Sequence, residues 1–310
     1  MKAETTLNPP STAKYSQGFW KRQVTSYVYI LPVLIIYGLM TFGPIITTII
    51  YSFQKVNLAK PPEWVGFQNY VRMFGNPLFL TAWKNILIFM GLSILMGFMV
   101  PIVLSLLVNE MRRLGKFFQT MVYLPSLIPI AVALLVWRQI YAPGGGVLNS
   151  ILTAVGIPAQ MWLQNPDMVK PSIVIIMTWL GAGGSVLIYL SALQEIPTEI
   201  YEAAELDGFS FMQRIWFITL PLLSSRMQIM LILQIINVGQ LFTEPYILTS
   251  GGPANASMTP VLELYRTAFD RSDFGLASAW SVSLLVVLSA FSVVYLWLSF
   301  RRDKRANPNS

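Results

Sequence analysis

The sequence of 310 residues contains no cysteine, no histidine and few charged residues. The lack of cysteine excludes disulfides, thiolate metal sites and cysteine catalysis. The lack of histidine removes the commonest metal ligand, the commonest general base and the usual pH switch. Charged residues make up 11% of the chain, whereas a soluble domain of this size has about 25%. Because 55% of the residues are hydrophobic, the sequence predicts a polytopic membrane protein.

Six segments are long and apolar enough to cross a bilayer core, which takes a helix of about 20 residues. They are residues 27–53, 85–108, 121–141, 172–193, 222–242 and 279–300. The first run is too long for the apolar region of a cleaved signal peptide, so we expect it to be retained. Proline and glycine interrupt several spans, which favours a transport path because freed backbone groups need protein or water as partners. The sequence thus predicts an all-α fold with six transmembrane helices.

The distribution of lysine and arginine predicts that both termini are cytoplasmic. With that orientation, 13 of the 21 basic residues fall inside and 8 fall outside. The clusters at 21–22, 112–116 and 301–305 all fall inside, as the positive-inside rule requires. The same rule explains the net charge of +7 without any nucleic-acid partner. The loop between the fourth and fifth spans is therefore expected on the cytoplasmic side.

The spans and loops lack the features of a self-powered transporter. No Asp or Glu lies in the middle of a predicted span, although proton-coupled carriers commonly place ionisable groups there. Sodium can be bound by carbonyls and hydroxyls, so an ion-coupled secondary carrier of small polar solutes stays as the alternative. A membrane enzyme is a weaker alternative, because no catalytic constellation is visible. The chain also lacks a phosphate-binding Gly-x-x-x-x-Gly-Lys-Ser/Thr loop, so an active transporter would take its energy from another chain.

A polar, acidic stretch interrupts the apolar chain between the fourth and fifth spans. It carries Glu202-Ala203-Ala204, then Gly208 four residues on, and ends at Leu220-Pro221 after Ile218. The small alanines would allow close packing against a partner, and glycine would allow a turn that a side chain would strain. The plainer alternative is an interfacial helix that begins at Thr198 and ends at Gly208.

This stretch resembles the cytoplasmic signature of permease subunits in bacterial binding-protein-dependent ABC importers, with seven matching positions over 20 residues. Residues 178–181, 246–253, 265–269 and 274–279, with Pro197, are similar to the carbohydrate branch and to the maltose-type first permease subunit. The resemblance implies a coupling helix that docks in a groove of the ATP-binding subunit. Glu202 would then meet a basic group, Ala203 and Ala204 would pack closely, and Gly208, Leu220 and Pro221 would shape the loop.

The resemblance also implies the architecture and the partners. The chain would have the type I ABC importer permease fold and would lie as a multi-pass protein in the bacterial plasma (inner) membrane. It would be non-catalytic and hold no cofactor, because partner subunits would bind ATP and Mg. The partners would be a second permease subunit, two ATP-binding cassette subunits, an extracytoplasmic solute-binding protein, the sugar and the lipid bilayer, with no nucleic acid. The segments would be a cytoplasmic N-terminal tail (1–26), a first helix with its external loop (27–80), a transmembrane domain (81–300) with the coupling loop (194–221), and a basic cytoplasmic tail (301–310).

The fifth span offers a candidate face for the solute. Gln234, Asn237, Val238 and Leu241 recur at i, i+3, i+4 and i+7, so they share one side of a helix. Side-chain amides donate to and accept from neutral hydroxyls, which suits a sugar. The resemblance adds Leu180, Gly181 and Gly184 of the fourth span to this substrate path. The alternative for the two amides is hydrogen bonding between helices, which polar residues in membrane bundles often provide.

Overall fold

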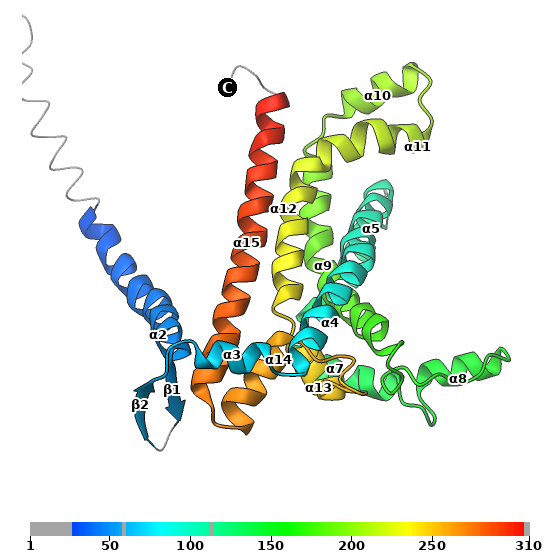
Figure 1. Cartoon of the computed structure of the whole chain (residues 1–310). Coiled ribbons are helices and arrows are strands. Elements are labelled where there is room, and N and C mark those ends of the chain that lie inside the picture. The colour runs from blue at the N-terminus through cyan, green and yellow to red at the C-terminus, as the bar shows by residue number, and fades with distance from the viewer. Residues whose placement is uncertain (1–26, 58–59, 112–113, 307–310) are drawn as a thin grey trace, which may run out of the picture.

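The computed structural model describes residues 27–57, 60–111 and 114–306, and it places side chains up to residue 297. The predicted N-terminal tail, 1–26, and the side chains of the predicted basic tail, 301–310, lie outside this description. In the described part, the chain is mostly helical, as expected (Figure 1).

Five helical segments of the described chain are each long and apolar enough to cross a membrane. They are Tyr27–Ser52, Leu78–Glu110, Val169–Gln194, Phe211–Gly239 and Phe274–Trp297. The first contains η1 (Gly38–Phe42) and α2 (Gly43–Ser52), and the second contains α4 (Leu78–Ser93), η2 (Ile94–Phe98) and α5 (Met99–Glu110). The third is α9 (Val169–Gln194), the fourth contains α11 (Phe211–Arg214), η4 (Ile215–Thr219) and α12 (Leu220–Gly239), and the last belongs to α15 (Phe274–Ala306).

The remaining predicted span, 121–141, is broken. It consists of α6 (Gly115–Tyr123), the short η3 (Leu124–Leu127) and α7 (Ile130–Ile140), and its two halves are bent by 99°. Ile128 and Pro129 are both extended at the break, because a residue before proline is driven out of the helical region. The interruption that proline predicts in this span is present, and it is a sharp bend. The broken segment links the end of α5 to the start of α9 at the opposite end of the bundle. Counted as one span, it brings the five continuous spans of the described chain to the six that the sequence predicts.

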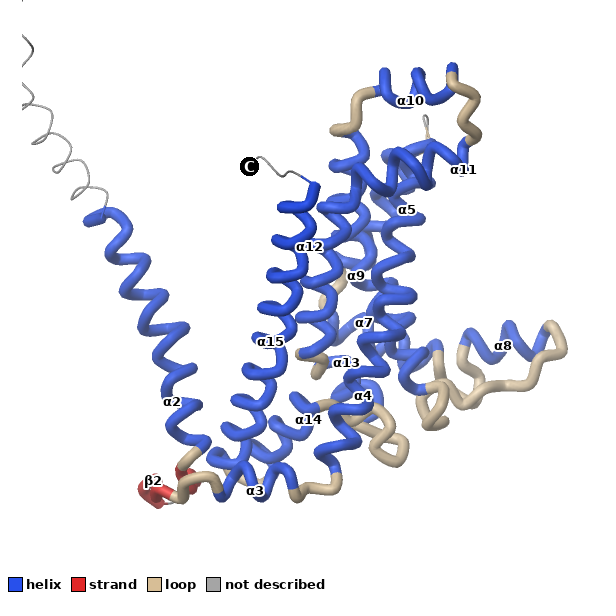
Figure 2. Tube along the Cα trace, turned by 45° about the horizontal axis from the view of Figure 1, so that its top comes forward, coloured by secondary structure: helices blue, strands red, loops and turns tan. Residues whose placement is uncertain are grey.

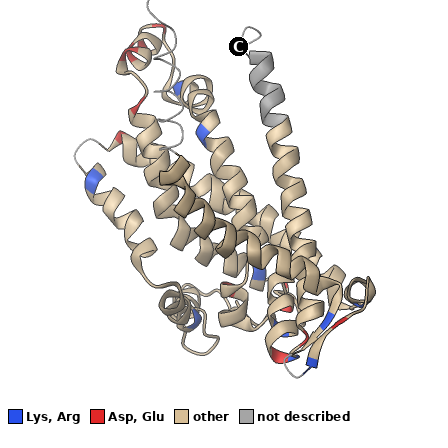
Figure 3. Cartoon of the chain, turned by 90° about the vertical axis from the view of Figure 1, so that its left-hand side faces the viewer, with Lys and Arg blue, Asp and Glu red and all other residues tan. Residues whose placement is uncertain are grey.

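Short elements cover the two ends of the bundle. At one end lie an antiparallel hairpin of β1 (Gln54–Asn57) and β2 (Lys60–Trp64), with α3 (Gln68–Phe74), α8 (Val147–Ala154), α13 (Thr243–Thr249), α14 (Pro260–Tyr265) and η5 (Arg266–Asp270). At the other end α10 (Thr198–Leu206) extends beyond the bundle, and α11 begins the span that continues into α12. Figure 3 shows that Lys, Arg, Asp and Glu gather towards these two ends. The small hairpin departs from the all-α prediction.

Helix α9 lies at the centre of the packing. Its fully buried Ile173, Val174 and Ile176 form one core with Phe89 of α4 and Val238 of α12. The first span differs, because no residue in its most apolar window is buried. Figures 1 and 2 show it leaning away from the bundle, with α2 nearest α15. Its apolar surface is therefore left for lipid or for another subunit.

Buried polar contacts hold the end that carries the hairpin. Glu263, which is fully buried, accepts hydrogen bonds through Oε1 from Asn76 Nδ2 at 3.1 Å and from Arg271 Nη1 at 2.8 Å. Asn85 Nδ2 donates to the carbonyls of Asn255 at 2.8 Å and Met258 at 3.0 Å. The amide of Asn85 therefore fastens the loop after α13 to α4.

The close approach of α6 to α9 depends on Gly183. An added Cβ there would lie 2.7 Å from both Tyr123 Cα and Val122 O, whereas a Cβ at Gly184 would meet nothing within 4 Å. We expect Gly183→Ala to destabilise the protein by about 1–3 kcal/mol, since overpacking forces backbone shifts. The measurement is the thermal unfolding midpoint in detergent, with Gly184→Ala as the matched control. Equal midpoints for the two variants would contradict this packing.

Candidate functional site

The loop between α9 and α12 forms a compact unit outside the bundle. Its first helix, α10, begins at Thr198 after the extended Pro197, which makes no side-chain cap. The helix ends at Leu206, and Gly208 follows two residues later with a φ of 81°, in the left-handed region. Phe209 N–H donates to Ala204 O at 2.9 Å and Gly208 N–H donates to Glu205 O at 3.1 Å, the bonding pattern of a Schellman turn. The turn expected at Gly208 is confirmed.

The returning half of the loop is capped in turn. Ser210 and Gln213 form a reciprocal capping box: Ser210 N–H donates to Gln213 Oε1 at 2.8 Å, and Gln213 N–H donates to Ser210 Oγ at 3.4 Å. The rings of Phe209 and Phe217 meet edge to face, with centroids 6.5 Å apart. Both ends of the turn are therefore fixed by local bonds, so the loop has a defined shape.

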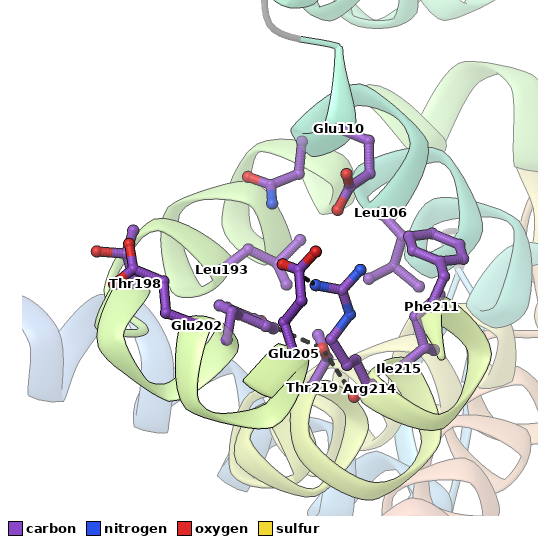
Figure 4. A pocket seen from close by; sticks show the side chains of 12 residues that line it. Leu106, Glu110, Leu193, Thr198, Glu202, Glu205, Phe211, Arg214, Ile215 and Thr219 are labelled. Carbon is purple, nitrogen blue, oxygen red and sulfur yellow. Dashed lines mark hydrogen bonds and ion pairs between the residues drawn. The ribbon is translucent and has the colours of Figure 1, made fainter. Parts of the chain in front are cut away.

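Two contacts tie α10 to the start of the span that contains α12 (Figure 4). Arg214 Nη1 lies 3.2 Å from Glu205 Oε2. The hydroxyls of Tyr201 and Thr219 lie 3.2 Å apart, and Thr219 also donates to Arg214 O at 3.3 Å. Thr219 is buried, whereas Glu205 is exposed, so the first pair is screened by solvent and contributes little stability. These contacts, named here the α10 brace, connect α10 to Arg214 and to Thr219, the residue directly before α12.

A cavity of about 370 Å³ lies beneath α10, between the loop and the ends of α5 and α9 (Figure 4). Its polar lining includes Glu110, Glu202, Glu205 and the guanidinium of Arg214. Among the described residues, no group of three or more acidic side chains is placed to hold a metal ion. The arrangement is suited to polar contacts with another molecule.

The two alanines of the signature lie on different sides of α10. Ala204 is 6% exposed and faces the protein, whereas Ala203 and Glu202 are exposed. Leu206 is 89% exposed, although it is a large apolar side chain at the end of the bundle that carries charge. We did not single out Leu206 from the sequence, but its spacing of i+3 from Ala203 and i+4 from Glu202 is the signal that places it on the same side. Leu220 is half-buried and Pro221 is exposed in the first turn of α12.

The predicted substrate-path residues divide between the core and an open face. On α9, Gly181 and Gly184 are exposed with open space in front of them, and Leu180 is half-buried. On α12, Asn237 is exposed and Val238 is 0% exposed, and Leu241, which follows the end of the helix, is 4% exposed; both apolar residues lie within the main core. In this structure Val238 and Leu241 therefore do not line an open path, contrary to expectation.

Gln234 is engaged between helices. Its Nε2 donates a hydrogen bond to Ser93 Oγ, in the residue before η2. A Cβ added at Gly97 would lie only 2.6 Å from the same Nε2, so the glycine leaves room for this amide. Leu233 and Gln240 are exposed with Asn237, at i, i+4 and i+7 of α12. The four predicted residues cover about 100° of the helix circumference. The exposed side, marked by Leu233, Asn237 and Gln240, overlaps this arc only at Asn237. Asn237 is the one predicted α12 residue on that open side.

A substitution at Gly208 tests whether the loop shape depends on its left-handed turn. A β-branched residue costs about 1–2 kcal/mol there, so Gly208→Val should raise trypsin cleavage after Arg214 by about 5–30-fold. Gly208→Asn is the matched control, since asparagine tolerates the left-handed region. The measurement is the rate at which the peptide ending at Arg214 appears by mass spectrometry. Equal rates in the two variants would rule out a conformational role for this glycine.

Comparisons with known proteins agree with this geometry. The family profile described as "Binding-protein-dependent transport system inner membrane component" matches residues 90–306. The chain is 30% identical to the probable ABC transporter permease protein YurN of Bacillus subtilis, covering 89% of this chain and 96% of that protein. It is also 30% identical to the arabinooligosaccharides transport system permease protein AraP of Halalkalibacterium halodurans, covering 91% and 89%.

A solved structure matches as well. It is the bacterial alginate ABC transporter in complex with an alginate pentasaccharide-bound periplasmic protein, whose chain is 27% identical to this one. The TM-score is 0.82, and the match covers 92% of this chain and 96% of that chain.

Proposed function

Because the chain belongs to the family of inner membrane components of binding-protein-dependent transport systems, we propose that it is a permease subunit of an ATP-driven oligosaccharide importer. It is a multi-pass protein of the inner membrane. One observation carries the proposal: a chain without a phosphate-binding loop presents the ordered signature loop clear of its membrane spans. The comparisons give no support to an ion-coupled carrier.

The proposed partners complete the machine. AraP is a permease for arabinooligosaccharides, and the alginate transporter was solved with a sugar-loaded periplasmic protein, which supports an extracytoplasmic binding protein for this chain. A second permease subunit would complete the pathway, and two ATP-binding cassette subunits would bind ATP and Mg. This chain would then be a non-catalytic half of the pathway. The loop 195–219 and both termini would lie in the cytoplasm, as the basic residues predict.

The loop geometry supports a route for the force. Ala203 and Leu206 are exposed on the outside of α10 and are free to enter a groove of an ATP-binding subunit. The exposed Glu202 lies at the edge of this surface, where it also lines the cavity beneath α10. When the ATPase subunits close, α10 would move, and the α10 brace through Thr219 would pass the displacement to α12. Helix α12 carries the open face, so the same movement would reach the solute path.

The proposed path runs along the outside of this chain's bundle. Gly181 and Gly184 of α9 leave space, and Asn237 and Gln240 of α12 offer amides that pair with sugar hydroxyls. Asn237 has no side-chain hydrogen bond among the described residues, whereas Gln240 Nε2 makes a long contact of 3.3 Å with Ile236 O. Because Val238 fills the interior, the second permease would supply the other wall of the path.

Charge reversal at Glu202 tests the coupling proposal. We expect Glu202→Arg to lose co-purification of the ATP-binding subunit and ATP-dependent uptake, because the exposed carboxylate would be replaced by a repulsive cation. Glu63→Arg is the matched control, because Glu63 is also an exposed glutamate and lies on β2 at the other end of the bundle. Undiminished co-purification and uptake by Glu202→Arg would contradict the proposal.

The two amides of α12 should respond differently to leucine. Asn237→Leu should reduce sugar uptake by reconstituted complexes. It should leave their assembly and thermal midpoint unchanged, since the amide of Asn237 makes no side-chain hydrogen bond among the described residues. Gln234→Leu should lower the thermal midpoint, because Ser93 would lose its partner and the helix contact would change; buried hydrogen bonds contribute about 0.5–1.5 kcal/mol. Normal uptake by Asn237→Leu would remove Asn237 from the path.

A further inference from the structure

Helix α8 is the core of a lateral arm, residues 147–161, that the import mechanism above does not use. Figures 1 and 2 show it extending sideways from the bundle, at the level where the spans end and far from α10. Val147, Ile151 and Val155 are 56%, 57% and 67% exposed and recur at i, i+4 and i+8, so they share one side of α8. Ile157 and Met161 add exposed apolar surface in the returning segment.

The arm is rigid because one buried amide ties its two halves together. Asn149, 3% exposed, donates through Nδ2 to Gln160 O at 2.9 Å and accepts from Gln160 N–H at 2.9 Å. Its Oδ1 also accepts from Trp162 Nε1 at 3.0 Å. Because the Asn149 amide faces inward and holds the returning segment, the apolar side chains on the other side of α8 face outward.

The arm offers little to a polar partner. No charged residue occurs between Arg138 and Asp167. The hydroxyls of Ser150 and Thr153 donate to the helix's own carbonyls, at Gly146 O (3.0 Å) and Asn149 O (2.9 Å). Hydroxyls satisfied in this way carry no unpaired donor into an apolar phase. A protein surface that docks reversibly in water has a polar rim, which this arm lacks.

We propose that the α8 arm is an interfacial anchor that rests in the membrane surface at the end of the bundle opposite α10. The partner is the phospholipid layer itself. An amphipathic segment of this kind inserts its apolar side about 5–10 Å into the boundary between headgroups and acyl chains. Helix α7, which precedes the arm, also exposes apolar side chains at Val132, Leu135 and Val136. By holding the arm in the membrane plane, the lipid fixes the broken third span at its outer end.

The absence of cysteine makes the test direct. Single variants Ile151→Cys, Val155→Cys and Thr153→Cys of the full chain are labelled with bimane and reconstituted into phosphatidylcholine–phosphatidylglycerol vesicles. Thr153 is the matched control, because it is exposed on the opposite side of the same helix. Doxyl-labelled phosphatidylcholine reports contact with lipid, and iodide reports contact with water. Monodisperse elution before reconstitution verifies folding of each variant, and two apolar positions guard against the loss of one.

We expect the doxyl lipid to quench the label at positions 151 and 155, with blue-shifted emission, and iodide to quench the label at 153. Stronger quenching by iodide at 151 and 155 would overturn the proposal. Shielding of 151 and 155 from both quenchers would also overturn it and indicate a second protein chain. If the labels were open to iodide until a solute-binding protein was added, the arm would be a protein-docking surface instead.

Discussion

The backbone must satisfy its own hydrogen bonds wherever lipid surrounds it, and this constraint governs the structure. Long helices meet the constraint, so irregular backbone is confined to places where protein can supply partners. The extended pair Ile128–Pro129 interrupts a span, and Gly183 allows the preceding α6 to lie directly against α9. The π-type turns η2 and η4 lie inside long helices that continue through them, so the backbone bonding of these spans is not broken there.

The ends of the bundle meet a different requirement, because there water can satisfy polar groups. One end is held by Glu263 and Asn85, whose bonds fix loops over the spans. The other end carries one compact loop, capped at Gly208 and Ser210 and joined to α12 by the α10 brace. The loops at the first end cover the spans, and the loop at the second end extends from them. This division fits the proposed function, in which solute enters at one end and force enters at the other.

Much of this was predictable from the sequence, because apolar length and helix-breaking residues report on it directly. The five continuous spans, the interrupted one, the loop that contains α10 and the left-handed turn at Gly208 are all local consequences of composition and spacing. The 99° bend was not predicted, since Pro125 and Pro129 indicate an interruption but not its angle. The hairpin of β1 and β2 was also missed, because prolines occupy β2.

The division of the α12 face could not be predicted from periodicity. Helical spacing groups Gln234, Asn237, Val238 and Leu241, but which part of that arc is covered depends on α4, α9 and α15. Those helices are distant in sequence, and their packing decides that Val238 is buried and Asn237 is open. The same holds for Ala203 and Ala204, which are adjacent in sequence and opposite in environment.

That last contrast has an evolutionary consequence. The residues of α10 that face its own chain, Tyr201 and Ala204, are interleaved with the exposed Ala203 and Leu206, and the exposed Glu202 lines the cavity beneath the helix. With the proposed docking, the exposed set would be free to change with a partner while the inward set preserves the attachment next to α12. In the proposed importer, a few substitutions on this surface would adapt the permease to a different ATP-binding subunit without a change in its membrane domain.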